Sequence, residues 1–350
     1  MDTEWICFDA VTGYDKGELN HAAQILWQGG LVAFPTETVY GLGGDGFNPQ
    51  AAKKIYEAKG RPSDNPLILH ISKREELDAI AARIPETAEK LMDAFWPGPM
   101  TLIFEKTKAV PYETTGGLDT VAVRMPSHEG ARQLIESAGV PVAAPSANTS
   151  GRPSPTTAEH VKEDLWGRID MIIDGGLVGI GVESTIIDVT EETPTILRPG
   201  HITKNMIAKV IGTVQMDAGL SGLDQSVKPK APGMKYRHYA PKASMTVIQG
   251  KKEAVIRRIE ELAAEYPKEK VGILATDETL SCYTHGQVVS AGSRNEHTIE
   301  QGLYRALREF DHMGVSVIFS ESFADDDRSE AIMNRLLKAA GQKIEYLSDK

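Results

Sequence analysis

The chain has 350 residues, of which 41% are hydrophobic and 25% charged, values typical of a globular protein with room for two domains. Its formal net charge of -11 argues against a protein whose main task is to coat nucleic acid, although it does not exclude a local basic site. No apolar run approaches the roughly 18 residues of a membrane-spanning helix, and the acidic start does not resemble a signal peptide. Cys7 and Cys282 form neither a CxxC pair nor a zinc-site spacing, so we expect reduced thiols and a cytoplasmic location.

The first elements surround a glycine-rich stretch. Apolar spacing predicts a helix over 18–28 and a buried strand over 31–34, after which residues 36–40 place hydroxyl groups around one carboxylate, Glu37. Four glycines follow within 41–46, before Asn48 and Pro49 begin a helix. We interpret this stretch as a ligand-binding loop at the end of a strand. The alternative is a tight connection whose glycines only adopt positive φ.

Strands and helices then alternate as far as residue 213. The predicted strands are 67–71, 101–105, 121–125, 140–144, 171–174, 184–189 and 195–200, and the predicted helices are 51–58, 74–95 with a break at Pro85, 128–138, 158–165 and 203–211. We assign residues 1–213 to a first domain.

A basic segment of weak periodicity, residues 214–243, follows that domain. The window from 227 to 252, which begins in this segment, contains no Asp or Glu, and its cations and aromatic residues include Lys228, Lys230, Lys235, Tyr236, Arg237, His238, Tyr239 and Lys242. A solvated linker and a strap over an anionic site both fit this composition. The alternation resumes over 244–350, which predicts a small parallel α/β domain whose role could be regulatory, structural or that of a lid.

Cations and hydroxyl groups gather near predicted strand ends of the first domain. Arg124 and Arg198 each end an apolar strand, and Lys59 and Arg61 end a helix. One such arginine is most simply a salt-bridge partner, but several beside hydroxyl-rich loops favour binding of phosphate or carboxylate. The loop 144–151 offers small hydroxyls and backbone N–H groups that suit a polyphosphate, with an ordinary Ser/Pro-rich loop as the alternative. No catalytic triad, HExxH or paired carboxylates are evident, and His70 alone reads as a core histidine.

Eight motifs together resemble one family. They are FPTETVYGLGGD (34–45), KGRPSDNPLILHI (59–71), WPGPMTL (96–102), VAVRMP (121–126), APSANTSGRPSPT (144–156), ESTIID (183–188), LRPG (197–200) and PGMKYRHYAP (232–241). In this order they resemble the YrdC/Sua5 family, in its two-domain Sua5 type of L-threonylcarbamoyladenylate synthase. The one departure is Gly44-Asp45-Gly46, where a small residue such as Ala is expected near the glycines.

The resemblance implies a fold and a reaction. The fold is α/β: a YrdC-like twisted, mostly parallel open sheet with a large concave cleft, followed by a small Rossmann-like α/β domain. The reaction converts L-threonine, bicarbonate or CO2, and ATP into threonylcarbamoyl-AMP and pyrophosphate, the first step of the t6A37 modification of tRNA. The product would pass to a separate tRNA threonylcarbamoyl transferase complex, with weak tRNA contact left open and no membrane partner.

The resemblance also implies roles for single residues. The positions that match L-threonine binding are Thr38, His70, Arg124, Ala144 and Ser184. The positions that match ATP binding are Lys59, Arg61, Asn65, Thr120, Ser146, Ser154, Arg198 and Tyr236. Arg124 would pair with the threonine carboxylate, Lys59 and Arg61 would stabilise phosphate charge, and Tyr236 would close over the nucleotide.

The implied chemistry needs no enzyme nucleophile. The threonine amine forms a carbamate, whose oxygen attacks the α-phosphate while pyrophosphate leaves, so positioning and positive charge suffice. Mg²⁺ would accompany ATP, held mainly by phosphate oxygens and water, and closure of the strap would exclude water.

Two rival functions remain open at this point. One is an RNA-binding module without turnover, which the net charge disfavours. The other is a carbamoylating hydrogenase-maturation enzyme, whose extra zinc-finger modules this chain has too few cysteines to form.

Overall fold

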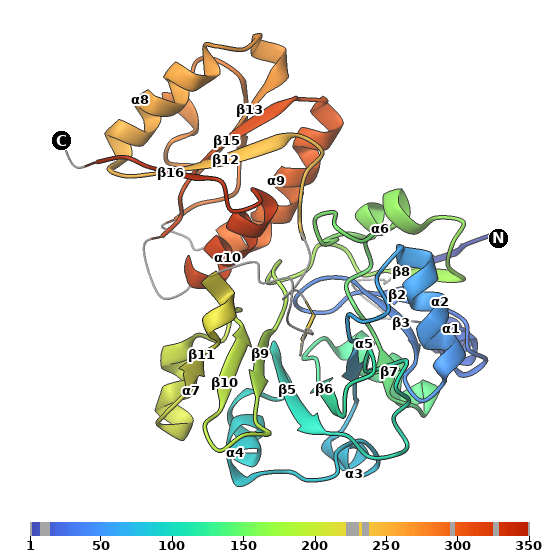
Figure 1. Ribbon diagram of the computed structural model, residues 1–350. Coiled ribbons are helices and arrows are strands. Elements are labelled where there is room, and N and C mark those ends of the chain that lie inside the picture. The colour runs from blue at the N-terminus through green and yellow to red at the C-terminus, as the bar shows by residue number, and fades with distance from the viewer. Residues whose placement is uncertain are drawn as a thin grey trace. The chain divides into compact units, whose positions relative to one another are not determined.

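The computed structural model describes residues 2–7, 15–221, 231–232, 238–294, 298–324 and 329–348, which divide into two compact units (Figure 1). The first unit comprises Met1–Ser150, Pro155–Gly179 and Glu183–Tyr236, and the second comprises Gly151–Ser154, Ile180–Val182 and Arg237–Lys350. Two short segments from before residue 213 thus group with the second unit. No helix of the described ranges is both long and apolar enough to cross a membrane.

The first unit is built on one large mixed sheet. In the described residues its strand order is β1-β8-β2-β3-β7-β4-β6-β5-β9-β10-β11. The strands are β1 (Glu4–Cys7), β2 (Val32–Phe34), β3 (Gly41–Asp45), β4 (Ile68–His70), β5 (Met100–Glu105), β6 (Thr120–Arg124), β7 (Val142–Ala143), β8 (Met171–Asp174), β9 (Thr185–Asp188), β10 (Thr195–Arg198) and β11 (Gln215–Met216). The α/β class is confirmed, but the expectation of a mostly parallel sheet is wrong. Of the neighbouring strand pairs in the described residues of this sheet, five are parallel and five are antiparallel.

Capping residues begin most helices of this unit. The helices are α1 (Lys16–Trp27), α2 (Pro49–Lys59), α3 (Leu77–Ile80), α4 (Glu86–Phe95), α5 (Glu129–Ala138), α6 (Ala158–Leu165) and α7 (Lys204–Ile211). Asn48 caps α2 through its side chain and Gly60 ends it in the left-handed conformation, both as the sequence predicts. The predicted break at Pro85 is confirmed, because α4 begins directly after it.

The glycine-rich stretch differs from the predicted loop, because most of it forms a strand. Gly41–Asp45 forms β3 and pairs antiparallel with β2, so most of the expected loop is a buried strand. These glycines do not have positive φ either. A Cβ on Gly43 would lie 2.8 Å from the side chains of both Phe34 and Val142, so this position needs glycine for close packing rather than for a turn.

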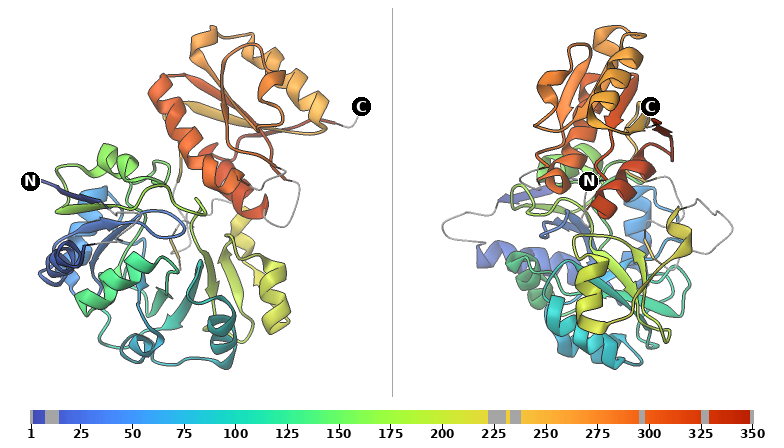
Figure 2. Two further views of the ribbon diagram at one scale, coloured as in Figure 1. Left: turned by 180° about the vertical axis from the view of Figure 1, so that it is seen from behind. Right: turned by 90° about the vertical axis from the view of Figure 1, so that its left-hand side faces the viewer.

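The second unit confirms the predicted parallel α/β domain. Its sheet is entirely parallel in the described residues, with the order β14-β13-β15-β12-β16. The elements are β12 (Ser244–Gln249), α8 (Lys252–Ala263), β13 (Val271–Ala275), β14 (Gln287–Ser290), α9 (Ile299–Met313), β15 (Val317–Glu321), α10 (Ser329–Ala339) and β16 (Ile344–Tyr346). Helix α8 covers one face, and α9 and α10 cover the other (Figure 1, Figure 2). The last strand, β16, was not predicted.

Candidate active site

Strand register gathers three polar side chains at one edge of the first unit's sheet. Strands β4 and β6 are parallel and end together, so that His70 lies beside Arg124. Strand β5 runs antiparallel to β6 and begins at the same edge, which places Thr101 on the other side of Arg124. Two of the predicted threonine-binding residues are therefore direct neighbours, held by backbone pairing rather than by loop conformation.

The buried guanidinium of Arg124 is surrounded by acceptors. Its Nη2 lies 2.7 Å from Oε1 of Glu37, and the two side chains are only 5% and 14% exposed. Its Nη1 donates to Oγ1 of Thr38 at 2.9 Å and its Nε to the Gly98 carbonyl at 3.3 Å. A hydroxyl contact of 2.9 Å between Thr36 and Thr38 fixes the loop that carries Glu37. The structure thus brings Thr38, His70 and Arg124 together and adds a carboxylate to them.

The electrostatics fix the charge states of this cluster at neutral pH. Burial raises the pKa of Glu37, but the charge and hydrogen bonds of Arg124 and a backbone hydrogen bond from Ser127 outweigh burial and lower it overall. Burial, together with the charge of Arg124, lowers the pKa of His70 to about 3. Nδ1 of His70 lies 3.1 Å from the Ile68 carbonyl, which can only accept, so Nδ1 carries the proton and Nε2 is an acceptor. Glu37 is therefore an anion and His70 a neutral polar group.

A second buried cluster joins residues predicted for different substrates. Ser184 precedes β9, and its hydroxyl lies 2.7 Å from Oγ1 of Thr101. Arg198, at the end of β10, donates from Nη2 to the same hydroxyl at 3.1 Å and from Nε to the Ser184 carbonyl at 3.0 Å. Ala144 lies close to the first cluster, because its N–H donates to the carbonyl of Ile68 on β4. Ser184, assigned to threonine, and Arg198, assigned to ATP, are thus in direct contact.

Lys59 supports the polar loop that follows β7. It is the last residue of α2, and its buried ammonium donates to the carbonyls of Ser146 and Asn148. The Ser146 hydroxyl donates to Oδ1 of Asn148 at 2.6 Å, and Ser146 also forms a β-bridge with Gly41. These contacts assign Lys59 to the support of the Ser146 loop. Its predicted action on phosphate remains a prediction.

Three further predicted ATP residues lie before β4 or at the start of β6. Arg61 donates from Nε to the Asn65 carbonyl at 3.2 Å and from Nη2 to the Pro66 carbonyl at 3.0 Å. Asn65 is 1% exposed, and its Oδ1 accepts no hydrogen bond from the described residues. Thr120 begins β6 whereas Arg124 ends it, a separation of about 13 Å along a strand. Arg61 thus supports the segment that leads into β4, and Thr120 lies at the opposite end of β6 from Arg124.

The remaining predicted positions are not placed with these clusters. Ser154 is fully buried and belongs to the segment Gly151–Ser154 of the second unit. Tyr236 lies outside the described residues, as do Lys228, Lys230, Lys235 and Arg237 of the predicted strap. No group of three His, Cys, Asp or Glu side chains in the described part of the chain is arranged to hold a metal ion.

Two site residues received no role from the sequence. Glu37 stands out there as the single carboxylate among hydroxyl residues, but its partner Arg124 lies 87 positions later and the motif does not link them. Thr101 opens an apolar strand and looks like an ordinary boundary residue. Only the pairing of β5 with β6 and β9 brings it to Ser184.

Comparison with known proteins covers both units. The Sua5/YciO/YrdC family model, described as "Telomere recombination", matches residues 24–200, and a model described as "Threonylcarbamoyl-AMP synthase, C-terminal domain" matches residues 202–341. The chain is 50% identical to the threonylcarbamoyl-AMP synthase of Pyrococcus abyssi over 94% of this chain and 96% of that protein. It is 51% identical to the Bacillus subtilis synthase over 93% and 94% of the two chains.

Solved structures give the same grouping. The crystal structure of P. abyssi Sua5 complexed with L-threonine matches with a TM-score of 0.92 and 47% identity over 99% of this chain and 100% of that one. Escherichia coli YciO matches 57% of this chain and 97% of its own, with a TM-score of 0.52 and 28% identity. The chain therefore belongs to the Sua5/YciO/YrdC family, in the form that also carries the threonylcarbamoyl-AMP synthase C-terminal domain.

Proposed function

We propose that this protein synthesises L-threonylcarbamoyladenylate from L-threonine, bicarbonate or CO2, and ATP, with release of pyrophosphate. The observation that carries the proposal is the buried pair of Arg124 and Glu37, 2.7 Å apart. One cation and one anion in contact complement the two charges of an α-amino acid, its carboxylate and its ammonium group. The named activity of the full-length relatives supports the same substrate class.

Arg124 binds the threonine carboxylate in this proposal, and Glu37 faces the amino group. Thr38 and the acceptor Nε2 of neutral His70 then orient the amino acid. Because a buried charge without a partner costs about 3–5 kcal/mol, Glu37 pairs with Arg124 until substrate supplies charges of both signs. Ser184 lies at the junction between the threonine and nucleotide sides, through its contact with Arg198.

The threonine ammonium first loses a proton to solvent. The free amine then adds to CO2 with loss of a second proton, or to bicarbonate with loss of water, and gives a carbamate. One carbamate oxygen attacks the α-phosphorus of ATP, and the bond to the leaving pyrophosphate breaks. Arg61 and Arg198 stabilise the phosphate charge, and Ser146 and Asn65 offer polar contacts to the nucleotide. Lys59 contributes by holding the Ser146 loop. ATP enters as its Mg²⁺ complex, with the ion held mainly by phosphate oxygens and water.

Three wider assignments belong to the same proposal. The product feeds the t6A37 modification of tRNA through a separate transferase complex. Tyr236 and the basic strap close over the nucleotide. The protein works in the reducing cytoplasm, which the free thiols of Cys7 and Cys282 support.

Pyrophosphate release from ATP tests the proposal when L-threonine and bicarbonate are each omitted in turn. Release is expected only with both present. Release that ignores threonine would refute the assigned reaction, and salt-sensitive RNA binding without any release would instead favour the binding-module alternative.

A further inference from the structure

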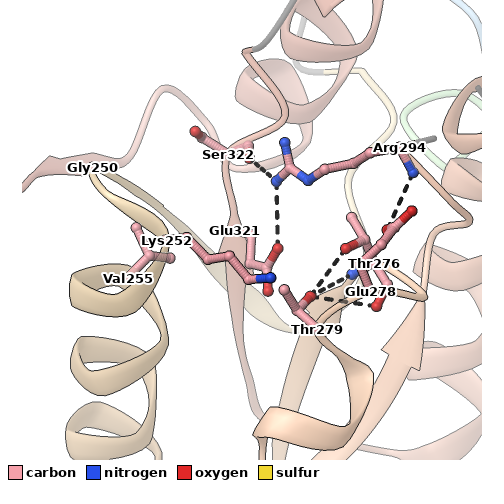
Figure 3. A pocket seen from close by; sticks show the side chains of 9 residues that line it. All are labelled: Gly250, Lys252, Val255, Thr276, Glu278, Thr279, Arg294, Glu321 and Ser322. Carbon is pink, nitrogen blue, oxygen red and sulfur yellow. Dashed lines mark hydrogen bonds and ion pairs between the residues drawn. The ribbon is translucent and has the colours of Figure 1, made fainter.

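The second unit contains a cavity of about 290 Å³ that the proposed synthesis does not use (Figure 3). Its lining comes from segments that directly follow three parallel strands. Gly250 and Lys252 follow β12, Thr276 follows β13, Glu321 ends β15 and Ser322 follows it. The cavity therefore lies at the carboxyl edge of the parallel sheet, within one unit of the structure.

The sheet topology makes this edge a natural binding position. In the order β14-β13-β15-β12-β16, the chain leaves β13 towards β14 in one direction and leaves β15 through α10 towards β16 in the opposite direction. Strands β13 and β15 are neighbours, so their two connections diverge from adjacent strand ends. In open parallel sheets this divergence opens the crevice in which ligands bind. The cavity coincides with that point.

A fixed polar network forms one wall of the cavity. Arg294 donates from Nη2 to the Ser322 carbonyl at 2.7 Å and lies 3.4 Å from Oε2 of Glu321. Glu321 is 4% exposed and also accepts from the hydroxyl of Tyr283 at 2.7 Å. These contacts, visible in Figure 3 for Arg294, hold the guanidinium and carboxylate in place and balance their charges. The wall is thus preorganised and close to neutral.

The opposite wall is positive. Lys252 is the first residue of α8, a helix of 12 residues whose cap residue Lys251 makes no side-chain hydrogen bond to the first turn. Figure 3 shows the Lys252 side chain reaching across the cavity, and no hydrogen bond or ion pair joins it to the other residues drawn there. The amides of a helix start and a nearby ammonium group together attract an anion, above all a phosphate.

The floor offers groups that recognise hydroxyls. Thr276 and Thr279 are buried, and their hydroxyls lie 3.0 Å apart. The Glu278 carboxylate accepts from the Ser293 hydroxyl at 2.6 Å and from the backbone N–H of Arg294 at 3.2 Å. These two hydrogen bonds fix the orientation of the carboxylate. A carboxylate has about four acceptor positions, so hydroxyl groups of a ligand can share it. Glu278 follows β13 and α8 begins after β12, so a carboxylate that can accept from ligand hydroxyls and a helix start that can attract a phosphate line the same cavity.

We propose that this cavity binds a small phosphate monoester that carries hydroxyl groups, with its phosphate at Lys252 and the start of α8 and its hydroxyls at Glu278. The volume is near the lower end of known ligand pockets, about 300–1,000 Å³, so the ligand is a sugar phosphate or mononucleotide rather than a dinucleotide. This site is independent of the proposed synthase reaction.

Residue-resolved NMR of the full chain tests the proposal with ribose 5-phosphate as the probe. The backbone amides of Gly250, Lys252 and Ser322 are expected to shift and saturate. Lys252→Ala should weaken this binding about tenfold, the effect of one charge-assisted hydrogen bond. Lys270→Ala is the matched control, because Lys270 precedes β13 at the opposite edge of the sheet and is exposed. Its titration should equal that of the wild type.

Two further measurements test separately how the cavity recognises the hydroxyl groups of the ligand and whether it accepts a base. Glu278→Gln should weaken ribose 5-phosphate but leave inorganic phosphate unchanged, and AMP in place of ribose 5-phosphate asks whether a base is accepted. Unmoved amides, or equal titration of Lys252→Ala and the wild type, would overturn the site. Equal affinity for inorganic phosphate and ribose 5-phosphate would overturn the assignment of a hydroxylated ligand. An unchanged denaturation midpoint of Lys252→Ala establishes that the variant is folded.

Discussion

Replacing Arg124 with alanine removes the cation that lies 2.7 Å from Glu37, together with hydrogen bonds to Thr38 and Gly98. The carboxylate that remains is 14% exposed, so the loss of its partner should cost about 3–5 kcal/mol of unfolding free energy. Burial alone then raises the pKa of Glu37, where in the wild type Arg124 holds it low. Arg124→Ala should also lose about 2–4 kcal/mol of transition-state stabilisation, which is about 30- to 1,000-fold in kcat/KM.

The sign of the pH dependence of the unfolding free energy distinguishes a buried, unpaired Glu37 from a nonspecific loss of stability in Arg124→Ala. In the wild type, the lowered pKa of Glu37 gives stability that is present above the unfolded value of 4.5 and is lost as the pH falls through the folded value. In Arg124→Ala the raised pKa reverses the sign, so acidification from neutral pH should stabilise the variant relative to the wild type. Urea unfolding at several pH values measures both slopes.

The double variant Arg124→Ala/Glu37→Gln is the control. It removes the stranded charge and should recover about half of the lost stability while remaining inactive, because Arg124 is still missing. A double variant as unstable as Arg124→Ala at every pH would refute the reasoning, and so would wild-type turnover of Arg124→Ala at low threonine.

Three other changes have expected outcomes. Thr101→Val removes the 2.7 Å contact with Ser184 and should raise KM for threonine and cost about 1 kcal/mol in urea unfolding, whereas Thr101→Ser should restore both. Gly43→Ala places a Cβ 2.8 Å from Phe34 and should cost about 1–3 kcal/mol in thermal or urea denaturation; an unchanged midpoint would contradict the close packing of β3. His70 has a folded pKa of about 3 against 6.5, so its contribution to stability is present above pH 6.5 and falls towards pH 3. The unfolding free energy of His70→Gln should depend less on pH in that window, and an unaltered slope would contradict the assigned charge state.

Local signals predicted the parts of the fold that depend on neighbouring residues in the chain. Asn48 and Thr203 begin helices as predicted because a capping side chain bonds within its own turn. Arg124 and Arg198 end their strands as expected, because the apolar runs before them are buried in the sheet. These features need no knowledge of the rest of the molecule.

Features that depend on distant partners were not predictable in this way. Glycines in β3 read as a loop, because their strand conformation is imposed by pairing with β2 and by the close approach of Phe34. Very short edge strands such as β11 and β16 carry too few residues for a periodic pattern. The pairing of Glu37 with Arg124 likewise joins the segment between β2 and β3 to the end of β6, 87 positions later in the chain. The family resemblance supplied site positions that composition alone could not.

The central claim is the chemistry, and product analysis tests it most directly. The purified protein would be incubated with ATP, L-threonine and ¹³C-bicarbonate. The nucleotides would then be separated and their masses measured by mass spectrometry. The account predicts threonylcarbamoyl-AMP in which one carbon is carbon-13, and no such product when threonine is left out. Formation of AMP or ADP alone, or an adenylate of threonine without the labelled carbon, would contradict it.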